Sequence, residues 1–171
     1  MKSILLATTV LALTGCASVV PGTALLASRM DPLTADPADI AAFPILPEGI
    51  GLLADESVLV LSGVRQSDGI SHAETFILSP WQGGYRIDPE DYERFRDQQV
   101  RLINWSEEVG LDGSLGITLA PCLIGRGPDA DARYSVDVIL RQGGARLPLL
   151  KDAPLKDIIE AFGEMSQCPG G

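Results

Sequence analysis

The order of its periodic segments is the feature that most constrains how this chain folds. Five segments are rich in apolar residues, most of them at every second position, which is the period of a β-strand. They cover residues 57–65, 72–78, 114–124, 133–141 and 146–150. Two segments instead repeat apolar residues every three or four positions, as helices do: residues 88–108, and a segment that begins at Pro154.

The order of these segments contains no repeating strand–helix–strand unit, which a parallel sheet would need. We therefore expect an α+β domain, with an antiparallel sheet of about five strands and two helices packed on one face. The alternative is a β-sandwich in which the first helix is an insertion between two sheets. Pro148 predicts that the last strand lies at a sheet edge, where a missing backbone donor breaks no pairing.

The first helix has a clear start signal. Asp88 supplies a capping side chain, and Pro89 supplies the φ angle that the first helical position needs. Apolar residues then recur at helical spacing, and we expect this stripe to be buried on the sheet. The stripe consists of Tyr92, Phe95, Leu102, Ile103 and Val109.

The N-terminal sixteen residues have the three parts of a secretory signal. Lys2 is followed by an apolar run over residues 4–13 and then by small residues, and this run is too short to cross a membrane. The tetrapeptide Leu13-Thr14-Gly15-Cys16 resembles the lipobox of bacterial lipoproteins, in which Leu, a small or β-branched residue and Gly or Ala precede the Cys. The remainder of the chain resembles small bacterial envelope lipoproteins, a resemblance that implies no activity.

The lipoprotein resemblance implies that cleavage precedes Cys16 and that the thiol and the new amino group of this residue carry acyl chains. Several chains together give a lasting membrane anchor. In lipoproteins that stay in the inner membrane an Asp follows the Cys, whereas here Ala17 occupies that position. The resemblance therefore favours the outer membrane, facing the periplasm. We therefore expect a signal peptide over residues 1–15, a lipidated tether and connecting segment over 16–56, and one globular domain over 57–171.

Charge and cysteine content narrow the possible partners. The formal net charge is −10, from 23 acidic and 13 basic residues, which argues against binding to nucleic acid. With Cys16 assigned to lipid, Cys122 and Cys168 are expected to form a disulfide in an oxidising compartment. Two independent buried thiols are the alternative.

Binding candidates lie in the segment Trp81-Gln82-Gly83-Gly84-Tyr85, where two aromatic residues flank a turn and Arg86 follows. Such rings can stack on sugars or grip a partner, and Arg86 adds hydrogen-bond donors. The plainer interpretation is that both rings fold back on the sheet. Trp105, on the first helix, is expected at the edge of the core.

No combination of residues in the sequence indicates catalysis. His72 is the chain's one histidine, and its neighbour Ser71 should point to the opposite face of a strand. One histidine and a paired Cys122 and Cys168 also leave too few ligands for zinc, and we expect no metal or other cofactor.

Two functions remain. The first is a non-catalytic, membrane-anchored lipoprotein of the periplasm that interacts with another envelope protein as an accessory factor. The second is a lipid-anchored binder of a small molecule or glycan, which would need a cleft lined by Trp81, Tyr85 and Trp105. A deep pocket would favour the second, and a flat or grooved apolar patch the first.

Overall fold

A computed structural model describes residues 18–23, 31–141 and 143–170 of the chain. The strands are β1 (Ala41–Ile45), β2 (Ile50–Leu52), β3 (Val58–Arg65), β4 (Ser71–Trp81), β5 (Gly84–Ile87), β6 (Leu111–Thr118), β7 (Pro121–Leu123), β8 (Arg133–Ile139) and β9 (Leu147–Pro154). The helices are the 3-10 helices η1 (Pro37–Asp39), η2 (Ala54–Glu56) and η3 (Pro89–Asp91) and the α-helices α2 (Tyr92–Val109) and α3 (Leu155–Phe162). The expected signal peptide and the lipidation residue Cys16 lie outside the described residues.

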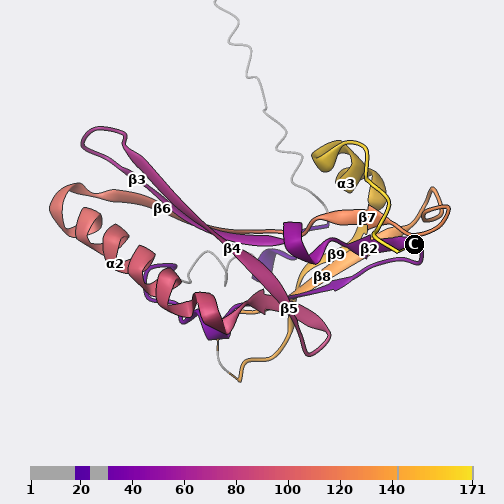
Figure 1. The fold of residues 1–171 in the computed structure, drawn as a ribbon, viewed down its shortest axis with the longest axis horizontal. Coiled ribbons are helices and arrows are strands. Elements are labelled where there is room, and N and C mark those ends of the chain that lie inside the picture. Colours follow the sequence, from indigo (N-terminus) through magenta and orange to yellow (C-terminus); the bar gives the residue numbers. More distant parts are fainter. Residues whose placement is uncertain (1–17, 24–30, 142, 171) are drawn as a thin grey trace, which may run out of the picture.

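Within the described residues, seven strands form one strongly curled antiparallel sheet in the order β6-β3-β4-β5-β1-β8-β9 (Figure 1). A separate two-stranded sheet pairs β2 with β7. The expected antiparallel sheet with helices is confirmed, but the expected five strands are too few. The expected packing of two helices on one face is not matched in detail, because α2 and α3 lie in opposite halves of the molecule.

Strand β1 is the largest departure from the sequence prediction. Its two alanines and Pro44 give it a weak strand propensity, yet it lies inside the sheet between β5 and β8. The pairing with β5 ends at Ala42, whereas the pairing with β8 continues to Ile45. Pro44 therefore lies beyond the end of β5, where its missing N–H disturbs no bond to that strand. Part of the expected connecting segment over residues 16–56 is thus built into the sheet.

A second proline, Pro80, lies within β4, which continues to Trp81 beyond the strand expected over residues 72–78. The two-residue turn at Gln82 and Gly83 has φ angles of 48° and 79°, which suit a tight hairpin. The pair that closes such a hairpin exchanges hydrogen bonds, so the next pair, Pro80 with Tyr85, does not. The nitrogen of Pro80 therefore points away from β5, and no bond is lost.

Helix α2 forms where the sequence predicts it and covers one half of the sheet. Phe95 and Leu102 are both 0% exposed, and the Phe95 ring centroid lies 5.2 Å from that of Phe76 on β4. The amide of Gln99 donates to the carbonyl oxygens of Pro32 and Ala35, at 3.0 and 2.7 Å. The helix thereby also holds part of the expected connecting segment against the fold.

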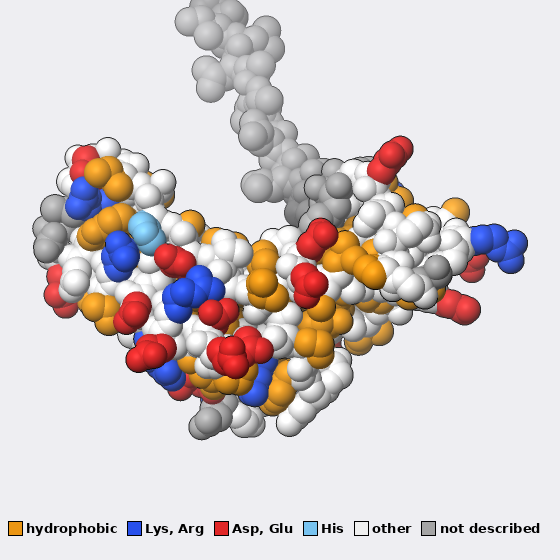
Figure 2. Space-filling model, in the orientation of Figure 1, with side chains coloured by type: hydrophobic (Ala, Val, Ile, Leu, Met, Phe, Trp, Pro, Cys, Tyr) orange, Lys and Arg blue, Asp and Glu red, His pale blue; other side chains and the backbone are white. Residues whose placement is uncertain are grey.

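Charged side chains gather over the α2 half of the face shown in Figure 2, whereas hydrophobic side chains gather toward the middle of the molecule. Part of this charge fixes the start of α2 to the sheet. The guanidinium of Arg94 donates to Asp91 at 3.1 Å, to Glu74 at 2.9 Å and to the Thr75 carbonyl oxygen at 3.0 Å. It also lies over the Phe76 ring, 4.3 Å from its centroid.

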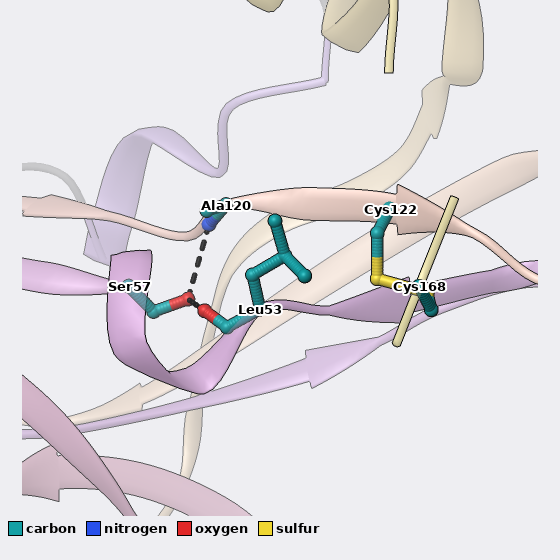
Figure 3. Close-up of a disulfide and its surroundings, with 5 residues drawn as sticks. All are labelled: Leu53, Ser57, Ala120, Cys122 and Cys168. Carbon is teal, nitrogen blue, oxygen red and sulfur yellow. Dashed lines mark hydrogen bonds between the residues drawn. A yellow bond between two sulfur atoms is a disulfide. The ribbon is translucent and has the colours of Figure 1, made fainter. Parts of the chain in front are cut away.

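The two sheets are joined by the buried residue Ser57, which precedes β3. Its hydroxyl donates to the Leu53 carbonyl oxygen at 2.9 Å and accepts from the Ala120 backbone N–H at 3.1 Å (Figure 3). Ala120 lies between β6 and β7, where the chain passes from the large sheet to the small one. This passage explains why the single strand expected over residues 114–124 is two strands.

The disulfide Cys122–Cys168 ties the C-terminal segment to β7, as the sequence predicts. The Cys168 N–H also donates to the Leu123 carbonyl oxygen at 2.8 Å. Gly51 of β2 pairs with Cys122, and a Cβ atom at Gly51 would lie 2.8 Å from the Cys168 sulfur. A glycine is therefore needed here for the disulfide to pack on β2.

Candidate apolar binding site

One face of the large sheet carries the core over half its width and a cavity over the rest. Residues that pair directly across strands share a face, so the register identifies this face. On β3 and β4 it presents Leu59 and Phe76, which are fully buried in the cluster that includes Phe95 of α2. On β1 and β8 it presents Ala42 and Val138, whose neighbours are the walls of the cavity.

Sheet strands, the segment from β6 to β7, two leucines outside the large sheet and helix α3 enclose this cavity. The sheet provides Ala42 and Pro44 from β1, with Tyr134, Val136 and Val138 from β8, and Leu149 and Leu150 from β9. The segment from β6 to β7 provides Ile117, Thr118, Leu119 and Pro121. Leu46, Leu52 and, from α3, Ile158 complete the lining.

The cavity has a volume of about 230 Å³. It is larger than the ~150 Å³ cavity in which an engineered protein binds benzene, and smaller than the roughly 300–1,000 Å³ of drug-sized sites. The cavity is partly open to the surface, and Ile117 in its lining is 36% exposed. Its size suits one slender ligand that can enter from outside.

The chemistry of the lining is almost entirely aliphatic. Thr118 and Tyr134 contribute the polar side chains among the described residues that line it, and none of those residues is charged. Such a surface offers a charged or strongly polar ligand nothing in exchange for its lost hydration. It can bind a hydrocarbon group by removing apolar surface from water.

A shallower depression of about 470 Å³ adjoins the cavity at Pro44, Leu46 and Leu52, which line both. Its other walls include the tip of the β4–β5 hairpin, with Trp81 and Tyr85. Pro44, Leu46 and Leu52 therefore separate the apolar cavity from the hairpin that the sequence singles out by no more than their own side chains.

The candidates Trp81, Tyr85 and Arg86 only partly converge. Tyr85 pairs with Pro80, whereas Trp81 is the next residue of β4, so the two rings project from opposite faces of the hairpin. The Trp81 ring lies against Phe43, with 6.2 Å between centroids, and Arg86 stacks on it at 4.7 Å. Phe43 and Arg86 therefore cover part of the Trp81 ring, although Trp81 also lines the shallow depression.

Gly84 allows this stack to form. A Cβ atom at this position would fall against the Phe43 ring, so only glycine lets the hairpin approach so closely. Arg146 covers Phe43 from another side, 3.5 Å from the ring centroid, and donates to the Gln82 carbonyl oxygen at 3.0 Å.

Trp105 lies far from this hairpin, so Trp81, Tyr85 and Trp105 do not form the cleft that the second function would need. The Trp105 ring contacts His72 edge-on, with 6.4 Å between centroids, and Arg65 lies 5.1 Å from it. His72 and Trp81 stand nine positions apart on the extended strand β4, which is about 30 Å.

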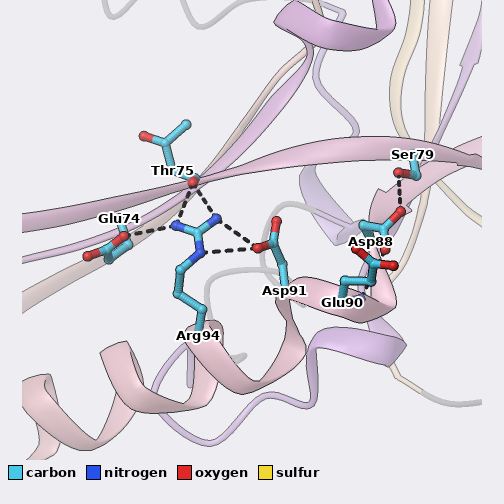
Figure 4. A network of polar contacts seen from close by, with 7 residues as sticks. All are labelled: Glu74, Thr75, Ser79, Asp88, Glu90, Asp91 and Arg94. Atoms are coloured by element: carbon cyan, nitrogen blue, oxygen red, sulfur yellow. Dashed lines mark hydrogen bonds and ion pairs between the residues drawn. The ribbon is translucent and has the colours of Figure 1, made fainter.

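In the described part of the chain, Asp68 and Asp88 have shifted pKa values, and both shifts have structural causes. The Glu90 backbone N–H, and then the Ser79 hydroxyl, donate to Asp88 and lower its pKa below 3.8 (Figure 4). The Arg65 side chain and the Ile70 backbone N–H lower the pKa of Asp68 in the same way. Neither carboxyl group lines the cavity.

Among the described residues, no group of three His, Cys, Asp or Glu side chains is placed to hold a metal ion. Nor does the described part of the chain contain a helix long and apolar enough to cross a membrane. No family model matches this chain, and no curated protein or solved structure shows significant similarity to it.

Proposed function

We propose that this protein is a non-enzymatic, membrane-anchored lipoprotein of the periplasm that binds a small apolar molecule in the cavity between β1, β8 and β9. One observation carries the proposal: apart from Thr118 and Tyr134, the described residues that line the cavity are aliphatic, and none of them is charged. Of the two functions that the sequence leaves open, this is the binder, with an aliphatic ligand in place of a glycan.

The ligand is a single hydrocarbon chain whose polar end stays outside. Each methylene moved from water into an apolar site contributes about 0.8 kcal/mol, so about eight would contribute roughly 6 kcal/mol. Part of this gain offsets the lost freedom of the ligand. Affinities weaker than micromolar are therefore expected, since 1 μM corresponds to about 8 kcal/mol.

A fatty acid carrying a fluorophore that brightens in apolar surroundings tests this proposal. The protein is the mature chain with Cys16→Ser, exported so that its disulfide forms. We expect saturable binding. In Ala42→Leu the added carbons occupy the cavity and displace about three ligand methylenes, which costs roughly 2 kcal/mol or about 30-fold in affinity.

Ala73→Leu is the matched control, because Ala73 is an exposed position on the opposite face of the same sheet. This variant should bind the probe as the parent does, and thermal melting should show both variants folded. If the parent shows no saturable binding, or Ala42→Leu binds as tightly as Ala73→Leu, the cavity is not the site.

A protein-interaction role is the second candidate, and the other face of the sheet favours it. Val64 and Ile77 are 41% and 49% exposed there, beside small uncharged residues of β6 such as Gly116. β6 is an end strand of this sheet, so one side of its backbone has no neighbouring strand among the described residues. A photo-crosslinker at position 77, compared with one at exposed position 93 on α2, should then capture a partner in intact cells; equal labelling would count against this role.

A further inference from the structure

The start of the described chain runs along the outermost strand of the sheet. The Val20 N–H donates to the Leu149 carbonyl oxygen, and the Lys151 N–H donates to the Ser18 carbonyl oxygen, each at 2.9 Å. Val19 thereby pairs antiparallel with Leu150. The expected tether is therefore fixed to the fold within a few residues of its lipidation site.

This pairing brings the N-terminal segment beside the apolar cavity. Leu149 and Leu150, the residues of β9 opposite Val19 and Val20, both contribute to the cavity lining. Cys16 precedes Ser18 by two residues, which span at most about 7 Å. Because paired strands lie about 5 Å apart, any acyl chain attached to Cys16 begins within roughly 12 Å of the strand that forms one wall of the cavity.

We propose that the occupant of this cavity is one of the acyl chains carried by Cys16 itself. This inference rests on the proposed function, because it requires that the cavity accepts a hydrocarbon chain. It identifies the source of that chain as the protein's own anchor rather than a free fatty acid or a membrane phospholipid.

The chemistry of the lining fits a tethered ligand better than a free one. The lining residues include no charged side chain that could recognise a carboxylate or a phosphate head group. A chain attached to Cys16 needs no such recognition, because the covalent bond already fixes its polar end. Tethering also gives it an effective concentration of about millimolar or more, which favours it over a dilute free ligand of the same chemistry.

The arrangement also divides the acyl chains of one molecule between two environments. An acyl chain in the cavity covers the apolar lining there, including Ile117, which is otherwise partly exposed to water. The chains that remain in the bilayer hold the protein there, since two are enough for stable anchoring.

Photo-crosslinking of the lipidated protein tests this assignment. Cells are supplied with a fatty acid that bears a diazirine near its end, so that the Cys16 acyl chains and the phospholipids both carry the label. After irradiation of intact cells, mass spectrometry of the purified protein identifies which peptides are joined. We expect a link between the Cys16 lipopeptide and the peptides that contain Val138 or Leu149.

Variants and a second readout separate the outcomes. Ala42→Leu should reduce this link at least five-fold, and Ala73→Leu should leave it unchanged. A phospholipid adduct on the cavity peptides, with no link to Cys16, would overturn the inference and leave the proposed function standing. If no crosslink forms but the Cys16→Ser protein still binds the fluorescent fatty acid, the inference is also overturned and the proposed function stands. If neither the crosslink nor the fatty-acid binding is seen, both proposals are refuted.

Discussion

Replacing Phe95 by Ala tests directly how α2 packs on the sheet. Phe95 is 0% exposed and contacts the Phe76 ring at a centroid distance of 5.2 Å. Removing a buried phenylalanine ring costs about 3–5 kcal/mol, depending on how far the surroundings can close the space.

The residues around Phe95 can move little to fill the space that its ring would leave. One residue before it, Arg94 is hydrogen-bonded to Glu74 and to the Thr75 backbone of β4. One turn later, the Gln98 side chain donates to the Leu61 carbonyl oxygen of β3 at 3.3 Å. Because these bonds hold the helix in place, we expect a loss in the upper part of the range, about 4–5 kcal/mol.

Urea denaturation followed by tryptophan fluorescence measures this loss. The midpoint should fall while the slope stays constant, and the melting temperature should drop by about 8–20 °C for a chain of this length. Val100→Ala is the control on the same helix, because Val100 is 57% exposed and should change stability by less than about 0.5 kcal/mol. Equal midpoints for Phe95→Ala and Val100→Ala would show that this face of α2 is not core.

Four further outcomes follow from single positions. Gly84→Ala should lower the melting temperature, whereas Gly116→Ala should not, since nothing lies within 4 Å of a Cβ atom at Gly116. Asp88 has a lowered pKa, so the contribution of its negative charge to stability is complete above pH 3.8 and disappears as the pH falls through its folded-state pKa; the stability difference from Asp88→Ala in pH titrations should shrink over that range. Cys168→Ser opens a loop with a sequence separation of 46, and chemical denaturation should show a loss of about 4 kcal/mol. Metabolic labelling with a fatty-acid probe should mark the parent and leave Cys16→Ser unlabelled; a labelled variant would contradict the lipid assignment.

The sequence predicts those elements whose signals are local. Helix α2 follows from Asp88, Pro89 and an apolar stripe, and the hairpin of β3 and β4 follows from alternation around a turn. β1 could not be predicted, because its alanines and Pro44 carry no local signal and only its neighbours β5 and β8 make it a strand. Tertiary pairing here overrides intrinsic propensity.

The cavity was only half predictable. The alternation of Tyr134, Val136 and Val138 predicts that one face of β8 is apolar, and the structure places all three in the cavity lining. The sequence cannot say what covers that face, because this depends on how far α2 extends across the sheet. The aromatic residue Trp81 drew attention instead, although its ring is engaged by Phe43 and Arg86.

The position of β1 also sets the order in which the chain can fold. Ala42 pairs with Val138, roughly 95 residues later, and contacts of such separation form slowly because a long loop must close first. The hairpins β3–β4 and β8–β9 each pair strands that are close together in the sequence, so they can form before β1 pairs with β8. A chain cut short before residue 133 would retain the first hairpin but could not build the cavity, whose opposing walls come from both ends of the sequence.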